Sequence, residues 1–124
     1  MDSHKITNAW AKTHMAVRHL AAAEQTVQQR VIDAFNKHLA RIPNEGLPQD
    51  IVSRLDEVRA NLILSPASAE GGAILRAPEQ LDLESAQQIA KDIVQLYWSI
   101  CQLRSTSSEV RTLEDEFKQQ ERFV

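Results

Sequence analysis

The four histidines are the first residues of this chain that could do chemistry, because imidazole binds metals and titrates near neutral pH. They are His4, His14, His19 and His38. Two histidines on one helix hold a metal when they are four residues apart, and no two of these have that spacing. The E-x-x-H motif of di-iron bundles is also absent. We therefore expect boundary or surface histidines, and the sequence predicts no metal site and no cofactor.

A dense acidic cluster near the end of the chain is the second candidate. Three carboxylates stand at residues 114–116 and a fourth at Glu121. Clustered carboxylates bind Mg²⁺, but a helical phosphohydrolase needs matching carboxylates on a facing helix, and residues 5–42 offer only Glu24 and Asp33 in their interior. We expect a solvated helix end here, and we keep a small helical-bundle phosphohydrolase as a second alternative function.

No nucleophile motif accompanies these groups. Cys101 lies between Ile100 and Leu103 and is expected to be a buried thiol. No G-x-S-x-G elbow occurs, and the Gly71-Gly72 pair lacks the lysine and the helix start of a phosphate-binding loop. The sequence therefore predicts that the protein is not an enzyme and has no catalytic residues.

Basic residues gather in the first third of the chain. Residues 1–42 hold six lysines and arginines against three acidic residues, a balance of +3, whereas the rest of the chain carries −6. Lys5 and Lys12 are seven apart and share a helix face, so together with Arg18 they are the candidate phosphate contacts of a nucleic-acid-associated protein. The net charge of −3 is not that of a dedicated nucleic-acid binder. We favour pairing between the basic first helix and the acidic remainder, and keep nucleic-acid association as the alternative function.

The composition is that of one ordinary globular domain. Of 124 residues, 43% are hydrophobic and 25% charged, which separates the chain from disordered proteins, and only 5% are aromatic, so the core should be aliphatic. The single cysteine allows no internal disulfide. No signal-peptide core and no run of 18 apolar residues is present. We therefore expect a cytoplasmic protein of bacterial type that does not enter a membrane.

Two long segments set the architecture. Residues 5–42 and 79–124 contain neither glycine nor proline, and their apolar residues recur at steps of three and four, the pattern of amphipathic helices and coiled coils. No run with a period of two indicates a sheet. The sequence thus predicts a single all-α domain over residues 1–124, with a helix over 4–42, a short helix over 48–64, a loop over 65–78 and a long helix over 79–123.

Two places in this layout are irregular. The serine-rich stretch at 105–108 favours caps and turns over helix interiors, so the last helix is either kinked there or divided in two. The loop over 65–78 is long for a helix–helix connection and contains two prolines and a Gly-Gly pair. It also contains Ile74 and Leu75, which a purely solvated linker does not need.

The lengths of the two main helices indicate a partner. At a rise of ~1.5 Å per residue each would run roughly 55–70 Å, whereas a compact domain of this size has a radius of gyration of about 14 Å. A seam of that length exposes more apolar surface than monomers usually tolerate. We therefore expect a long antiparallel, coiled-coil-like helical hairpin plus one short helix, in a helical bundle completed by dimerisation. A monomeric three- or four-helix bundle is the alternative.

Aromatic and loop residues are the candidate protein contacts. Trp98 follows Tyr97, and neighbouring residues on a helix cannot face the same way, so one of the two should meet a partner. Ile74, Leu75 and Arg76 are the candidates in the loop. The sequence predicts a homodimeric, non-catalytic interaction protein, such as an adaptor, a secretion-type chaperone or a regulatory inhibitor, with an unidentified protein client.

Overall fold

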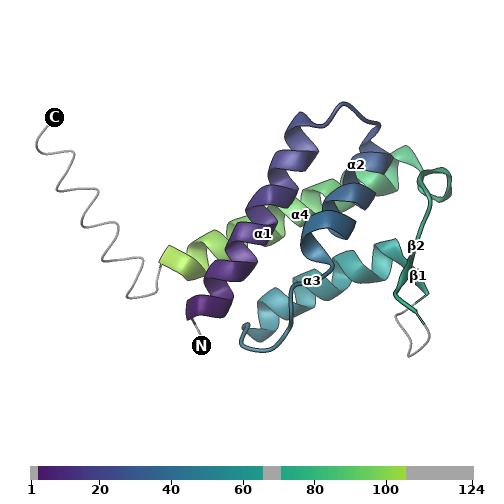
Figure 1. Ribbon diagram of the computed structural model, residues 1–124. Coiled ribbons are helices and arrows are strands. Elements are labelled where there is room, and N and C mark those ends of the chain that lie inside the picture. Colours follow the sequence, from purple (N-terminus) through teal and green to yellow (C-terminus); the bar gives the residue numbers. More distant parts are fainter. Residues whose placement is uncertain (1–2, 66–70, 106–124) are drawn as a thin grey trace, which may run out of the picture.

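The molecule is built mainly from helices, as the sequence predicts. The computed structural model describes residues 3–65 and 71–105. Within these ranges the α-helices are α1 (Ser3–Ala22), α2 (Val27–Ala34), α3 (Gln49–Leu62) and α4 (Leu83–Ser105). Helix α4 contacts each of the other three, and α1 and α2 lie side by side against it (Figure 1). The fold is therefore an all-α bundle arranged around α4.

The expected single helix over residues 4–42 is wrong, because the chain reverses between α1 and α2. Thr26 caps α2, its side chain accepting a hydrogen bond from the backbone N–H of Gln29 at 3.2 Å. Arg30 Nη1 donates to the carbonyl oxygen of Leu20 at 2.9 Å, which satisfies an acceptor at the open end of α1. Side chains thus end one helix and begin the next without glycine or proline, and the reversal brings α2 back onto α4.

This reversal shortens the first helix. α1 has 20 residues and therefore spans ~30 Å. It does run antiparallel to α4, since Trp10 lies against Arg104 near one end of the pair, and Val17 and Leu20 lie beside Ala90 further along. The structure thus shows a short antiparallel pair inside a bundle in place of a long free-standing hairpin. Any need for a partner must be judged from the surface rather than from helix length.

Helices α3 and α4 lie close to their predicted bounds. α3 begins and ends within two residues of the expected segment 48–64. α4 begins at Leu83, four residues later than expected, and runs without interruption to Ser105. The predicted continuation to residue 123, with its alternatives of a kink or a division, lies outside the described residues.

A π-helix, η1 (Phe35–Leu39), extends α2. Its hydrogen bonding is seen where the backbone N–H of Ala40 donates to the carbonyl oxygen of Phe35 at 2.8 Å. Phe35 and Leu39 are both buried, so the wider turn still places its large side chains in the core. The chain then turns towards α3 through Gly46, whose φ of +83° is a conformation that glycine adopts easily.

Two further expectations are wrong in the segment between α3 and α4. The sequence predicts no sheet, and it predicts a loop without regular structure over 65–78. Strands β1 (Ile63–Ser65) and β2 (Ile74–Leu75) pair antiparallel, with Ile63 opposite Leu75. A short 3₁₀ helix, η2 (Pro78–Gln80), follows. Strands of two and three residues are too short to show a period of two, which is why the pattern did not reveal them.

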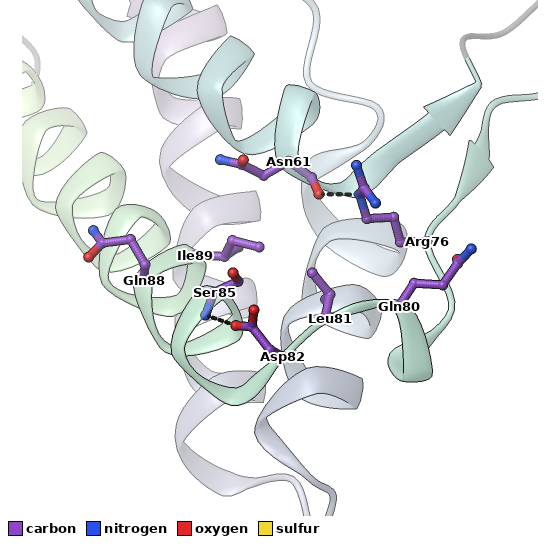
Figure 2. Close-up of a pocket in the computed structure, with 8 residues that line it drawn as sticks. All are labelled: Asn61, Arg76, Gln80, Leu81, Asp82, Ser85, Gln88 and Ile89. Atoms are coloured by element: carbon purple, nitrogen blue, oxygen red, sulfur yellow. Dashed lines mark hydrogen bonds between the residues drawn. The ribbon is translucent and has the colours of Figure 1, made fainter.

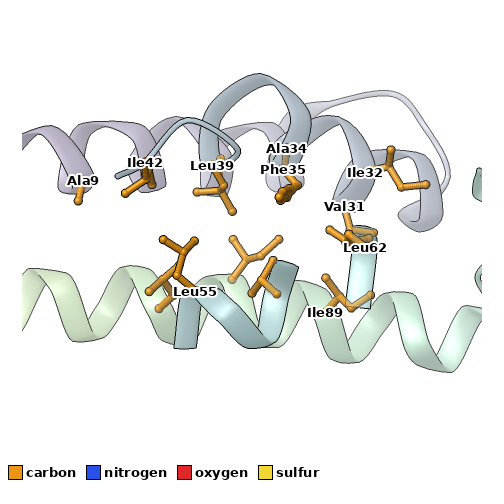
Figure 3. Close-up of a cluster of buried hydrophobic side chains, with 14 of the residues drawn as sticks. Ala9, Val31, Ile32, Ala34, Phe35, Leu39, Ile42, Leu55, Leu62 and Ile89 are labelled. Carbon is orange, nitrogen blue, oxygen red and sulfur yellow. The ribbon is translucent and has the colours of Figure 1, made fainter. Parts of the chain in front are cut away.

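The core lies between a layer of α1, α2 and η1 and a layer of α3 and α4 (Figure 3). Phe35 and Leu39 from the first layer and Leu55 and Ile89 from the second are almost completely buried. Apart from Phe35 the buried apolar residues are aliphatic, in agreement with the low aromatic content. This shared interior fixes α1 beside α4 and so positions the surface that the two helices form together.

Candidate interaction surface

The inner contact between α1 and α4 is aromatic and holds Tyr97. The Tyr97 hydroxyl and His14 Nδ1 lie 3.3 Å apart and share a hydrogen bond. The His14 ring stacks on Trp10, with centroids 5.2 Å apart, and the Arg104 guanidinium lies 4.0 Å from the centre of the Trp10 ring. A hydrogen bond with Cys101, together with burial, raises the pKa of the Tyr97 hydroxyl. Tyr97 is thus engaged within the chain.

The neighbouring Trp98 points elsewhere. Its side chain is 54% exposed, and Val94, one turn earlier on the same helix, is 47% exposed. Large apolar side chains that stay this accessible in a bundle are candidates for contact with another molecule. The sequence singled out Trp98 but missed Val94. Val94 lies four residues before Trp98 and beside the buried stripe of α4, and this position in the sequence could have identified it.

An apolar groove adjoins these two residues. It runs between the second half of α1 and the middle of α4 and has a volume of about 400 Å³. Most of its lining side chains are aliphatic, and one of them carries a charge. The lining residues are Val17, Leu20 and Ala21 from α1, with Ala90, Lys91, Val94 and Gln95 from α4. We refer to this groove together with Trp98 as the α1–α4 face.

The surface around the groove carries few charges. The exposed residues of α4 from Gln87 to Gln102 are Gln87, Gln88, Lys91, Val94, Gln95, Trp98 and Gln102. The exposed residues of α1 are His4, Ala11, Met15, Arg18, Ala21 and Ala22. Of the charged residues among these, Lys91 on α4 lines the groove, whereas Arg18 on α1 lines a different hollow. Charge depletion around an aromatic residue is typical of the centre of a protein–protein interface.

The predicted contact residues of the loop lie in another part of the molecule. Ile74 on β2 is 57% exposed, whereas Leu75 packs against the core. The backbone N–H of Arg76 donates to the carbonyl oxygen of Leu62 at 2.9 Å, and its Nε donates to that of Asn61 at 3.0 Å. Arg76 therefore fastens the chain to the end of α3. The structure does not bring this group together with Trp98.

Arg76 also lines a polar pocket of about 320 Å³ between the end of α3 and the start of α4 (Figure 2). Several of its polar groups hold the local structure. Asp82 accepts a hydrogen bond from the backbone N–H of Ser85 at 2.6 Å, which caps α4 and lowers the pKa of the Asp82 carboxyl. Gln80 Oε1 likewise accepts from the backbone N–H of Ala77 at 2.7 Å. These bonds hold the connection between the two helices.

The basic residues considered for phosphate contact are not gathered into one site. Lys5 forms an ion pair with Glu45 at 3.5 Å, and Lys12 donates to the carbonyl oxygen of Arg41 at 3.4 Å. Arg18 instead lines a separate hollow with Met15, His19, Ala22, Ala23 and His38. Two of the three cations thus tie α1 to the segment after η1.

The histidines form no metal centre in the part of the chain that the structure describes, where no three metal-binding side chains gather. The rings of His19 and His38 lie with their centroids 6.2 Å apart. Burial lowers the pKa of His38, and the neighbouring charges of His19 and Lys37 act in the same direction. The acidic cluster at 114–116 and Glu121 lie outside the described residues.

Comparisons with known proteins give no match from which a function could be inferred. No family model matches the chain, and neither a curated protein nor a solved structure matches it. Among the described residues, no helix is both long enough and apolar enough to cross a membrane. A functional proposal therefore depends on the geometry and chemistry of the surface itself.

Proposed function

We propose that the protein is a non-catalytic interaction module that binds another protein through the α1–α4 face. The observation that carries this proposal is the exposed pair Val94 and Trp98 beside an apolar groove, on a surface with few charges. Tryptophan is among the residues most often found as energetic hot spots of interfaces. A groove between two helices also suits recognition of a partner helix or of a bulky apolar side chain.

Covering the exposed apolar residues of this surface contributes free energy to binding. A tryptophan side chain buries roughly 150–250 Å² when it is fully covered. Covering the exposed half of Trp98 at about 25 cal/mol per Å² contributes about 2–3 kcal/mol. Val94 and the groove walls add further apolar area. In a homodimer these contributions occur twice, which favours the predicted dimeric bundle over a monomer.

In this proposal the module works as an adaptor, a secretion-type chaperone or a regulatory inhibitor, because each of these roles requires only recognition. Lys5 and Lys12 already have partners within the chain, so no observation favours the nucleic-acid alternative. The helical-bundle phosphohydrolase depends on the carboxylates at 114–116, which lie outside the described residues, so that alternative stays untested.

Site-specific photo-crosslinking tests the location of the interface. A photoreactive amino acid replaces Gln95, which lines the groove, and in a matched variant it replaces Glu57, which is exposed on α3. We expect a discrete protein adduct in cells that make the protein from position 95 and none from position 57. Adducts from both positions, or from neither, contradict a specific contact at the α1–α4 face. The mass of the adduct shows whether the occupant is a second copy.

A further inference from the structure

We propose that the groove of the α1–α4 face is filled by Trp98 of a second copy of this chain, in a two-fold symmetric dimer whose axis passes beside α4 at the level of Val94 and Gln95. This inference rests on the proposed function and names its partner. It requires one face to carry both a projecting side chain and the hollow that receives it, because a two-fold interface joins the same surface on both copies.

The spacing along α4 meets this requirement. The groove is lined by Ala90 and Lys91 at one end of its α4 wall, and Trp98 projects seven residues after Lys91. The midpoint between Lys91 and Trp98 falls between Val94 and Gln95. When two α4 helices pack antiparallel about an axis at this level, each Trp98 lies ~5 Å from the axis along the helix direction, at the level of the partner's Lys91. Each indole then meets the groove of the other copy.

The groove fits an indole in size and chemistry. Its volume of about 400 Å³ lies in the range of roughly 300–1,000 Å³ that accommodates ring-containing ligands. Val17, Leu20 and Ala21 provide an apolar wall for the faces of the ring. The one cation in the lining, Lys91, comes to lie beside the ring of the incoming Trp98, where a cation–π contact is favourable.

The charge pattern also favours a second copy over a charged partner. A two-fold axis brings every charge near the axis towards its own copy, and like charges repel. Lys91 is the one charged residue that lines the groove, and the arrangement places it against Trp98, whereas Arg18 lines the separate hollow on α1. A near-neutral face can therefore meet itself without repulsion.

The size of the face is near the lower limit for a dimer. The stretch of α4 from Gln87 to Gln102 is ~24 Å long. Two adjacent helices present a width of about 20 Å. The resulting area of about 480 Å² per copy, or about 960 Å² for the pair, is close to the roughly 1,000 Å² in total that a specific interface needs.

Sedimentation of the full chain is the first test. We expect the wild type to dimerise at micromolar concentration, and Trp98→Ala to raise the dissociation constant about a thousandfold, since each dimer loses two tryptophan contacts worth about thirtyfold each. Leu64→Ala is the matched control, because Leu64 is 52% exposed on β1, away from the face. Its dissociation constant should stay within about threefold of the wild type. A wild type that remains monomeric at about 100 µM overturns the dimer.

Mixing two variants tests whether the occupant is Trp98 itself. Ala21→Arg places a long side chain at the rim of the groove, at an exposed helical position where arginine is tolerated, and leaves Trp98 in place. Trp98→Ala leaves the groove open but removes the indole. Each variant alone should be monomeric, whereas their mixture forms a heterodimer at least about thirtyfold tighter than either homodimer, because one tryptophan again meets one open groove.

The outcomes separate this inference from the proposed function. A mixture that associates no better than the separate variants overturns the exchange of Trp98. Circular dichroism melting of each variant identifies any loss that comes from misfolding, and Trp98→Phe supplies a second, smaller truncation if the alanine variant melts early. A monomeric wild type that still gives an adduct with another protein from position 95 overturns the dimer while leaving the α1–α4 face as an interaction surface.

Discussion

Helices α3 and α4 present opposite kinds of outer surface although both bury an aliphatic stripe. The exposed residues of α3 include four charged side chains, Asp50, Arg54, Asp56 and Glu57. The exposed residues of α4 include two, Glu84 and Lys91, and this helix also exposes Leu83, Val94 and Trp98. The two helices therefore differ on the side that faces away from the core.

The outer sides of the two helices differ in how much free energy they gain when another molecule covers them. Charged side chains keep their hydration on a free surface, so the outer side of α3 gains little from being covered. An exposed tryptophan and valine gain free energy as soon as another apolar surface excludes water from them. Burial in the core is similar for both helices and does not distinguish them. Only the outer composition indicates which helix contacts another molecule.

The largest expected effect lies on the inner side of α3. Leu55 is almost completely buried, so Leu55→Ala should lower the free energy of unfolding by about 2–5 kcal/mol. The adjacent exposed residue provides the control, since Arg54→Ala should change it by less than about 0.5 kcal/mol. Urea unfolding followed by circular dichroism measures both. Equal losses for the two variants would contradict the division of α3 into a stabilising and a solvated side.

The next effect concerns the outer side of α4. Val94→Arg should leave the free energy of unfolding within about 0.5 kcal/mol of the wild type, because Val94 is half exposed. It should weaken self-association by several kcal/mol, since two like charges then meet near the two-fold axis. Sedimentation equilibrium and urea unfolding of the same sample separate the two quantities. Ala60→Arg on α3 is the matched change of one positive charge at an exposed position, and a comparable loss of association there would contradict the contrast between the helices.

Most of the helical layout was predictable because it follows from periodicity. The apolar stripe of α3 and that of α4 repeat at helical spacing, and their buried residues, such as Leu55 and Ile93, are those the pattern indicates. The reversal at 23–26 was not predicted, because the argument relied on glycine and proline as helix breakers. The available signal was Thr26 followed three residues later by Gln29, the spacing of a capping box.

The candidate surface was predictable only in part. Trp98 was selected from the sequence because it cannot share a direction with Tyr97, and the structure shows Trp98 exposed and Tyr97 bonded to His14. The groove could not be predicted, since its walls come from two helices far apart in the chain. Val17 and Ala90 meet only because α1 folds back along α4, and that depends on tertiary packing.

The reversal itself can be weakened without touching the face. Thr26→Ala removes the hydrogen bond accepted from Gln29 and should lower the free energy of unfolding by about 1 kcal/mol. Thr7→Ala within α1 is the control, because alanine is the better helix former and no cap is lost. Thermal unfolding compares the two. If Thr26→Ala and Thr7→Ala lower the free energy of unfolding equally, the Thr26 cap does not hold the reversal. The position of α1 beside α4 would then depend on core packing alone.

The smallest expected effect is a pH dependence on the side of α1 away from the groove. The folded state lowers the pKa of His38 through burial and through the positive charges of His19 and Lys37. Below its ordinary pKa of about 6.5 the unfolded chain therefore binds a proton more readily than the folded chain, so the free energy of unfolding falls as the pH drops from 7 towards 5.

Replacing His38 should remove its contribution to the pH dependence of the free energy of unfolding. His38→Gln keeps a polar side chain of similar size but does not titrate, so its urea midpoint should vary less between pH 7 and pH 5 than that of the wild type. The effect is small because His38 is only partly buried and solvent screens its neighbours. Since His38 lies in the hollow with Met15 and Arg18 rather than in the groove, the dissociation constant of the dimer should not follow this titration. A dissociation constant that does follow it, and loses that dependence in His38→Gln, would show that the two sides of α1 are coupled.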